Sequence, residues 1–252
     1  MIVIAFAGRK GGIGKTTSSQ NVGASLSRKG YKVLLVDLDS QANLTTSLGI
    51  REPITANVGS YLLGQSKFID AVITEGGLDV LPSSDVLIAQ EDTIKAAPAY
   101  PFNLRKALDK VKDKYDFVVL DCPPALSGLT RIGLVAADYY FIPLEAEFLA
   151  YEGLRKFIEF ANDVQEISGR SQLGGVFATR YNPNIKKKLS NELVGQVSDQ
   201  LAGYFLRTYI RENIALSEAQ AMGRNIFDYA PDSNGAEDYE KLTTEILTRI
   251  KA

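Results

Sequence analysis

The stretch Ile2-Val-Ile-Ala-Phe-Ala-Gly-Arg-Lys-Gly-Gly-Ile-Gly-Lys-Thr-Thr17 decides the fold of this 252-residue chain. Residues 2–7 form a short, continuous apolar run of the kind that a buried parallel strand requires. A glycine-rich loop follows, and a helical pattern then extends from about Lys15 to Lys29, where Gly30 marks its end. A strand, a glycine-rich loop and a helix in direct succession predict the first unit of a parallel α/β sheet.

The loop between this strand and this helix has the composition of a phosphate-binding site. Gly11, Gly12 and Gly14 lack Cβ atoms, so the backbone can curl with its N–H groups pointing inward, where the helix dipole helps them to hold phosphate oxygens. Lys15 adds a cation for the outer phosphates, and the hydroxyl of Thr16 can bind Mg²⁺. The general pattern G-x-x-x-x-G-K-[ST] is not met, because Arg9 occupies its first glycine position, so a glycine-rich turn with a chance lysine is the alternative.

Strand and helix patterns alternate along the whole chain. We expect a three-layer α/β fold of the P-loop NTPase type, with a mostly parallel central sheet flanked by helices on both faces, in a single domain of residues 1–252. Functional groups should then lie at the carboxyl ends of the strands. The predicted strands are 2–7, 32–36, 78–81, 117–120, 139–142, 173–179 and 205–210, and the predicted helices are 15–29, 85–97, 102–112, 150–166, 236–250 and one between the last two strands.

The composition excludes several classes of chemistry. The chain has no His and one Cys, so it cannot use Ser-His-Asp or Cys-His catalysis or form the usual zinc and iron–sulfur sites. Its 28 Lys and Arg residues nearly balance 30 Asp and Glu residues, which argues against a globally basic nucleic-acid binder but allows a local basic face. Any chemistry must therefore use lysines, carboxylates, hydroxyls, backbone amides and a bound metal or cofactor.

A second lysine in the loop, Lys10, carries more specific information. The sequence from Lys10 to Thr17 resembles the ParA/MinD family of deviant Walker A ATPases, whose loop reads K-G-G-x-G-K-[ST]-[ST]. The resemblance implies that ATP and Mg²⁺ are the cofactors and that Lys10 reaches across an ATP-dependent homodimer to the partner's phosphates, as an arginine finger does. A solvated loop lysine is the alternative. The implied phosphate-site residues are Lys10, Gly11, Gly12, Ile13, Gly14, Lys15, Thr16 and Thr17.

Two further segments resemble family motifs at the ends of strands. Residues 37–45 resemble D-x-D-P-Q-x-N-x-T, which implies that Asp39 positions or activates the attacking water, while Asp37 organises the loop or the metal shell. Asp121 begins a segment that resembles D-x-P-P-S-L-S, which implies that its carboxylate holds Mg²⁺ directly or through water. Turn formation is the alternative for the first pair, and we expect Cys122 to serve packing. The candidate catalytic residues are Lys10, Lys15 and Asp39, and the candidate metal-site residues are Thr16, Asp39 and Asp121.

The resemblance continues to the end of the chain through the segments 143–153, 216–219 and 233–239. It implies adenine contacts from Asn182 and from the stretch Ile210, Arg211, Glu212 and Asn213. Because the chain begins at its first strand, we expect no N-terminal helix-turn-helix extension, and any sequence-specific DNA recognition would belong to a separate partner.

The C-terminal region distinguishes a membrane-binding relative from a DNA-binding one. The apolar residues of 236–252 follow a helical spacing without Trp or Phe, which favours a helix that faces the core over a membrane-binding tail. At Asn184 and Ala215 the chain departs from the arginines that are common in DNA-binding family members, although the adjacent lysines can replace the first. A solvated helix face is the alternative for these lysines. The candidate DNA contacts are Lys186, Lys187, Lys188, Arg180, Arg207, Arg211 and Arg224.

The sequence therefore predicts a ParA-type ATPase for plasmid or chromosome partition. The resemblance implies a dimer that forms with ATP, binds DNA non-specifically, and is released when a ParB-like centromere-binding partner stimulates hydrolysis. It also implies a cytoplasmic protein that associates with the nucleoid when ATP is bound, and no membrane partner. The alternatives are a MinD-like or cargo-positioning ATPase that acts on a membrane or a protein assembly, and a metabolic enzyme on the same scaffold.

Overall fold

The central sheet of the computed structural model has seven strands in the order β3-β4-β2-β5-β1-β6-β7. The structure describes residues 1–145, 150–185, 188–201 and 203–250. All neighbouring strands run parallel except β3, which is antiparallel to β4 at one edge. The strands are β1 (Ile2–Phe6), β2 (Val33–Asp37), β3 (Ile73–Glu75), β4 (Leu78–Leu81), β5 (Phe117–Asp121), β6 (Tyr139–Glu145) and β7 (Gln172–Thr179).

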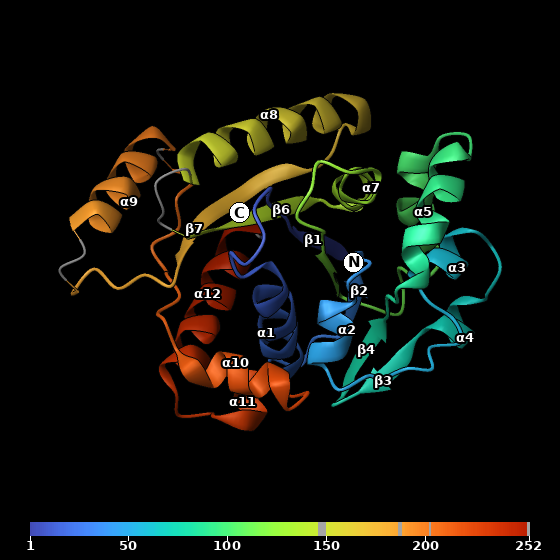
Figure 1. The fold of residues 1–252 in the computed structure, drawn as a ribbon, viewed down its shortest axis with the longest axis horizontal. Helices are drawn as coiled ribbons and strands as arrows, with labels where there is room; N and C mark the ends of the chain where they lie inside the picture. The colour runs from blue at the N-terminus through green and yellow to red at the C-terminus, as the bar shows by residue number, and fades with distance from the viewer. Residues whose placement is uncertain (146–149, 186–187, 202, 251–252) are drawn as a thin grey trace.

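Helices cover both faces of this sheet, as Figure 1 shows. On one face lie α1 (Lys15–Arg28), α2 (Asn43–Ser47), α10 (Ile214–Ala221), α11 (Ile226–Tyr229) and α12 (Asn234–Ile250). The other face is covered by α3 (Val58–Leu62), α5 (Val86–Ala96), α6 (Asn103–Asp109), α7 (Gly128–Ala136) and α8 (Ala150–Ser168). The remaining helices are α4 (Phe68–Ala71), the 3₁₀ turn η1 (Tyr100–Phe102) and α9 (Lys188–Gln200). This arrangement confirms the three-layer α/β fold.

The alternation of side chains along each strand explains why the sheet needs both helical layers. In β5, Val118 and Leu120 join the core cluster on one face, whereas Phe117 and Val119 join the cluster on the other. Successive side chains of a strand point to opposite faces, so a continuously apolar strand is stable only between two layers. The strand side chains on both faces are therefore mostly apolar, and the buried Asp37 and Asp121 lie at the carboxyl ends of β2 and β5.

The predicted strand at 205–210 is wrong. Only isolated bridges join Phe205 to Val176 and Ile210 to Thr179, and the residues between them leave the edge of the sheet. The carboxylate of Glu245 in α12 accepts hydrogen bonds from the backbone N–H groups of Arg207 and Thr208, both at 2.9 Å. A side chain thus takes the place of the strand-to-strand hydrogen bonds that would have continued the sheet.

The other predicted strands and helices are present, with ends that differ by a few residues. The sequence patterns missed the short edge strand β3 and the helices α2, α3, α4, α7, α10 and α11. Part of the family-like segment 143–153 lies outside the described residues.

The helix α12 faces the core, as its spacing predicted. Its apolar residues Tyr239, Leu242, Ile246 and Ile250 are buried in the cluster that also contains α1. Within the described residues, none of the helices has the length and apolar character needed to cross a membrane.

The contact between α1 and β2 yields a test of the core packing. A Cβ atom on Gly23 of α1 would lie 2.4 Å from the buried Cδ2 of Leu35, whereas a Cβ on Gly195 of α9 meets nothing within 4 Å. Alanine normally stabilises a helix interior relative to glycine, but overpacking of a core costs about 1–3 kcal/mol. We expect Gly23→Ala to lower the free energy of unfolding by about 1–2 kcal/mol and Gly195→Ala to raise it by up to about 1 kcal/mol. Urea denaturation checks both values, and an unchanged or raised stability of Gly23→Ala would contradict this packing.

Candidate nucleotide site

A cleft with a volume of about 840 Å³ lies where the loop between β1 and α1 meets segments from the C-terminal part of the chain. One wall consists of Gly11 to Thr17, and the opposite wall includes residues 210–214 and helix α10. Asp39, Gln41 and Asn43 close a third side. A cleft of this size has room for a nucleotide.

The phosphate loop is held open by its backbone conformation. Gly12 and Gly14 adopt positive φ angles of 77° and 96°, which L-residues with a Cβ atom rarely adopt. The hydroxyl of Thr179, at the end of β7, donates a hydrogen bond of 2.9 Å to the carbonyl oxygen of Ile13, and its methyl group would lie 3.5 Å from a Cβ on Gly14. Thr179 is the last residue of the predicted strand 173–179 and therefore lies at the functional edge of the sheet, but a threonine there gave no distinct sequence signal of a role in the site.

Lys15 is buried at the base of this loop. Its Nζ donates a hydrogen bond of 3.0 Å to the carbonyl oxygen of Lys10, which folds the side chain back across the loop. Burial lowers the pKa of Lys15, while the charge of Asp121 opposes this shift. A cation held in such a dry position interacts strongly with an anion that enters the cleft.

Asp121 connects the end of β5 to the first turn of α1. Its carboxylate accepts a hydrogen bond of 2.7 Å from the hydroxyl of Thr16 and one of 3.2 Å from that of Ser19. Burial first, and then the charge of the nearby Asp37, raise the pKa of Asp121 to about 8 against the opposing effects of Thr16 and Lys15. The charged form of this carboxyl group is therefore disfavoured in the empty site, and a nearby cation would stabilise it.

Asp37 and Asp39 have different environments, although Asp37 ends β2 and Asp39 follows only two residues later. The oxygens of the fully buried Asp37 accept hydrogen bonds from the backbone N–H and the hydroxyl of Thr45, at 2.9 and 2.8 Å, and from the N–H of Asp39 at 3.0 Å. Burial raises the pKa of Asp37 to about 6. Asp39 lines the cleft, and its Oδ1 accepts the N–H of Gln41. Asp37 therefore organises the segment, and Asp39 faces the space where a ligand would lie.

The donor set fits a magnesium ion that is held partly by phosphate oxygens. Mg²⁺ is usually bound by one or two protein oxygens together with waters and substrate phosphates. Thr16 and Asp121 supply a hydroxyl and a carboxylate in mutual contact next to the phosphate loop. Among the residues that the structure describes, His, Cys, Asp and Glu do not form a cluster of three or more that could hold a metal on its own.

The C-terminal wall contains most of the residues that the resemblance implies for adenine. Ile210, Arg211, Glu212 and Asn213 line the cleft, whereas Asn182 does not, and its Oδ1 instead accepts the N–H of Asn184. Further lining residues that the sequence did not reveal come from α2 and α10, whose short polar patterns give no distinct signal. They are Thr46, Ser47, Ile214, Leu216, Ser217, Gln220 and Ala221.

One side chain of α1 ties the two walls together. The amide nitrogen of the buried Gln20 donates hydrogen bonds to the carbonyl oxygen of Ser47 at the end of α2, at 2.8 Å, and to that of Arg224 after α10, at 3.0 Å. Beside this bridge, Gly49 and Gly223 are so close that a Cβ on Gly223 would lie 2.6 Å from the Cα of Gly49.

Comparison with known proteins assigns the family. Residues 1–173 match the protein family described as an AAA domain. The chromosome-partitioning ATPase Soj of Treponema pallidum is 38% identical over 249 residues, which cover 98% of this chain and 97% of that protein. The chromosome partitioning protein ParA of Caulobacter vibrioides is 34% identical over 253 residues, which cover 98% and 94%. The chain belongs to the ParA/MinD family of P-loop ATPases.

A solved structure of a metabolic enzyme is also similar to this ParA/MinD-family chain. Cobyrinic acid a,c-diamide synthase from Mycobacterium smegmatis, with a bound ATP analogue and magnesium, superposes with a TM-score of 0.88 at 31% identity. The match covers 100% of this chain and 96% of that one.

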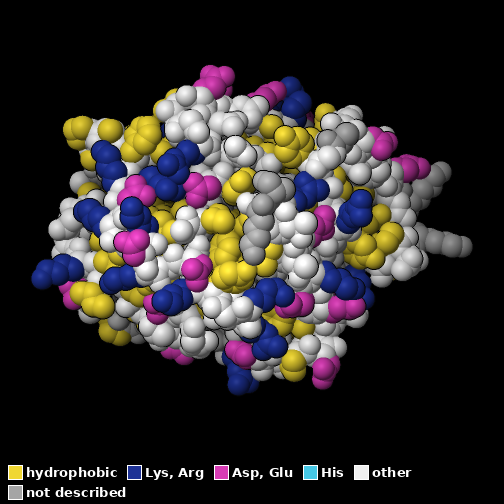
Figure 2. Space-filling model, turned by 180° about the vertical axis from the view of Figure 1, so that it is seen from behind, with side chains coloured by type: hydrophobic (Ala, Val, Ile, Leu, Met, Phe, Trp, Pro, Cys, Tyr) yellow, Lys and Arg dark blue, Asp and Glu magenta, His cyan; other side chains and the backbone are white. Residues whose placement is uncertain are grey.

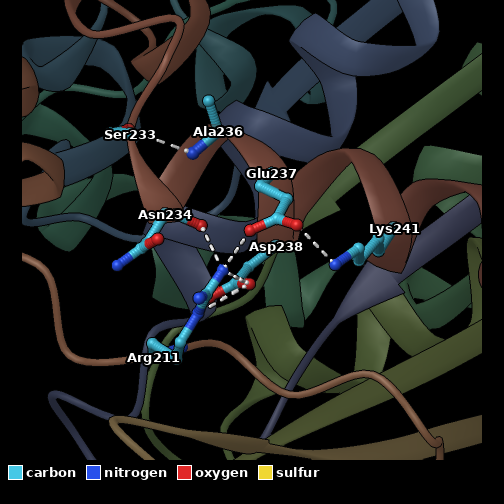
Figure 3. A network of polar contacts seen from close by, with 7 residues as sticks. All are labelled: Arg211, Ser233, Asn234, Ala236, Glu237, Asp238 and Lys241. Carbon is cyan, nitrogen blue, oxygen red and sulfur yellow. Dashed lines mark hydrogen bonds and ion pairs between the residues drawn. The ribbon is translucent and has the colours of Figure 1, made fainter.

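The basic residues expected to contact DNA differ in whether a carboxylate already pairs with their charge. The guanidinium of Arg211 is paired with Asp238 and Glu237, as Figure 3 shows, and that of Arg180 lies 3.2 Å from the carboxylate of Glu145. Arg207 and Arg224 are exposed. On the face seen in Figure 2, basic and acidic side chains are interspersed. Lys186 and Lys187 lie outside the described residues, and Lys188 begins α9.

The raised pKa of Asp121 predicts how stability depends on pH in the absence of nucleotide. The unfolded chain loses this proton near its ordinary value of 3.8 and the folded chain near 8, so the stabilising contribution is complete below the unfolded pKa and is lost as the pH rises through the folded pKa. We expect the free energy of unfolding of the wild type to fall between about pH 5.5 and 8.5, and to fall less in Asp121→Asn. Urea denaturation in EDTA at several pH values measures this slope, and identical slopes for the two proteins would contradict the assignment.

Proposed function

We propose that this chain is a ParA-type ATPase that hydrolyses ATP with Mg²⁺ and acts in plasmid or chromosome partition. One observation carries the proposal. The phosphate loop, Lys15 and the contact between Thr16 and Asp121 form one site, in a chain that is similar over nearly its whole length to Soj and ParA proteins. We also take residues 1–252 as one domain, because the described strands form a single sheet with a core cluster on each face.

In this proposal each group of the site has a distinct part in ATP hydrolysis. The N–H groups of the loop and Lys15 bind the β- and γ-phosphates, and Thr16 and Asp121 hold Mg²⁺, which neutralises the charge on the transferred phosphoryl group when bound. Asp39, which lines the cleft, orients the water that attacks the γ-phosphate. No histidine is required, because a carboxylate can orient the water and Lys15 stabilises the developing charge.

The dimer is the second part of the proposal. Lys10 is exposed, and it does not line the cleft of its own chain even though it is adjacent to the loop. This position supports a contact across an ATP-dependent homodimer, where Lys10 would stabilise charge on the partner's nucleotide. The Nζ of Lys15 donates a hydrogen bond to the carbonyl oxygen of Lys10. The backbone from which the Lys10 side chain extends is therefore fixed by the phosphate loop.

DNA is the third part. We propose that the ATP-bound dimer binds DNA non-specifically, that a ParB-like partner stimulates hydrolysis and release, and that the protein is cytoplasmic and nucleoid-associated in its ATP state. The near balance of 28 basic and 30 acidic residues supports weak binding by the monomer. The exposed Arg207 and Arg224 are the described candidates with the freest charges, and Lys186, Lys187 and Lys188 are the further candidates from the sequence.

The similarity to a cobyrinic acid diamide synthase favours one second candidate, an ATP-dependent synthetase. Partition is preferred because Soj and ParA relatives match the whole chain at 38% and 34% identity. The thiol of Cys122 is also unsuited to nucleophilic chemistry, because it is buried in the core and burial raises its pKa. A membrane-positioning role is less favoured because the apolar stripe of α12 is already buried.

Substitution of the two lysines should separate nucleotide binding from hydrolysis. Lys15→Ala removes charge-assisted hydrogen bonds worth about 1.5–3 kcal/mol, so ATP affinity should fall roughly 10- to 150-fold. Lys10→Ala should leave ATP binding by the monomer nearly unchanged but reduce turnover on the order of 10³-fold, as expected for a cation supplied in trans. Calorimetric titration and a phosphate-release assay measure the two effects. Loss of monomer binding in Lys10→Ala would show that this lysine acts within its own chain.

DNA binding should depend on the nucleotide. In co-sedimentation with non-specific duplex DNA, we expect binding with ATP or a non-hydrolysable analogue and little with ADP. Replacing Lys186, Lys187 and Lys188 by Ala should reduce the slope of log affinity against log salt by about one for each phosphate that is no longer neutralised. An unchanged slope removes these lysines from the interface, and binding that is absent or independent of ATP overturns the partition function.

A further inference from the structure

Two carboxylates on one face of α12 hold the backbone that leads into, and then forms, the C-terminal wall of the cleft. Glu245 accepts the N–H groups of Arg207 and Thr208. Asp238, two turns earlier on the same helix, accepts the N–H of Arg211 at 2.9 Å. The backbone at residues 207–211, in and just after the predicted strand, is therefore held in place by side chains of α12.

Asp238 is the more deeply placed of the two carboxylates. Its side chain is only 5% exposed, and it also binds the guanidinium of Arg211, whose Nη2 lies 2.6 Å from Oδ1 and whose Nε lies 3.0 Å from both oxygens. Figure 3 shows that Glu237 contacts the same guanidinium from the outer side and is itself paired with Lys241. The hydrogen bonds to Asp238 and Glu237 raise the pKa of Arg211. The negative charge of the buried Asp238 is therefore paired with the guanidinium of Arg211. Asp238 holds Arg211 through both its backbone and its side chain.

The fixed backbone is the part of the wall that faces a ligand. Ile210 donates its N–H to Ala178 of β7, and Asn213 caps α10 by accepting the N–H of Ala215. Arg211 lies between these two anchors, so Asp238 holds the middle of the lining segment. The next residue of α12, Tyr239, lines the cleft and is hydrogen-bonded to Ser18 of α1.

We propose that Asp238 is a positioning residue for the base end of the nucleotide. By accepting the N–H of Arg211, it holds residues 210–213 at the distance that the base and ribose of ATP require, and it leaves the phosphate loop unaffected. This inference rests on the proposed ATP function and adds to it a residue that sets affinity for one part of the ligand.

A matched pair of double variants tests the role of the acceptor. Arg211→Met/Asp238→Asn removes the charge pair but keeps a side-chain oxygen that can accept the N–H of residue 211. Arg211→Met/Asp238→Leu removes that oxygen as well, and in both variants no buried charge is left unmatched. Lys241→Ala is the control for the exposed part of the network, since Lys241 contacts only the outer carboxylate among the residues in Figure 3.

The readout compares a ligand that has a base with one that has none. Unlabelled ATP and inorganic tripolyphosphate each displace a fluorescent ATP analogue from the full chain in the presence of Mg²⁺. We expect the Leu variant to bind ATP about five- to tenfold more weakly than the Asn variant, as loss of one hydrogen bond implies, and tripolyphosphate to within twofold of it. Lys241→Ala should keep wild-type ATP affinity to within about threefold. Both double variants carry Arg211→Met, so any effect of losing this lining side chain cancels when the two are compared.

Each other outcome has a definite meaning. Equal losses for ATP and tripolyphosphate would assign Asp238 a general structural role and overturn the proposal, as would equal ATP affinity in the Asn and Leu variants. If the Leu variant does not fold by circular dichroism, Arg211→Met/Asp238→Ala, which also lacks the acceptor oxygen, takes its place, and ATP affinity equal to that of the Asn variant overturns the proposal. Failure of the wild-type chain to bind either ligand would instead reject the proposed ATPase function.

Discussion

The hydrogen bond between Thr16 and Asp121 joins the first turn of α1 to the end of the central strand β5. The register of the sheet explains why these groups meet, because Phe6 of β1 and Asp37 of β2 both pair with Asp121. The phosphate loop leaves β1 at this level, and the segment that carries Asp39 leaves β2 at the same level. The phosphate loop, Thr16, Asp121 and Asp39 therefore lie at one edge of the sheet, which the parallel strands provide.

This arrangement requires acidic groups to be buried side by side. Asp37 and Asp121 are both fully buried, and burial raises the pKa of each. Burial of charge without a partner is unfavourable, so the folded chain tolerates these groups through hydrogen bonds from Thr45, Thr16 and Ser19 and through the apolar cores on both faces. Without a bound cation, these buried carboxyl groups lower the free energy of unfolding, and a bound cation would be stabilised by them.

The sequence was sufficient for those parts of the structure whose cause is local. Continuous apolar runs specified the parallel strands, and the glycines, Lys15 and Thr16 specified the loop. It failed where the cause is distant in the chain. Residues 205–210 are apolar enough for a strand, but Glu245 of a later helix replaces their sheet hydrogen bonds. The pairing of the Arg211 guanidinium with Asp238 is likewise a distant contact, which no local pattern reveals. Asn182 was implied for adenine, yet its side chain caps a turn outside the cleft.

The bridge made by Gln20 has a consequence for how the cleft exchanges its contents. One buried amide nitrogen is bonded to both Ser47 and Arg224, so the wall that carries Asp39 and the wall that follows α10 are fastened to the same turn of α1. Beside them, the backbones of Gly49 and Gly223 are too close to admit a side chain. Separating α2 from the segment that follows α10 would therefore break the interior hydrogen bonds of Gln20 and the close contact of these two glycines, so this side of the cleft resists opening.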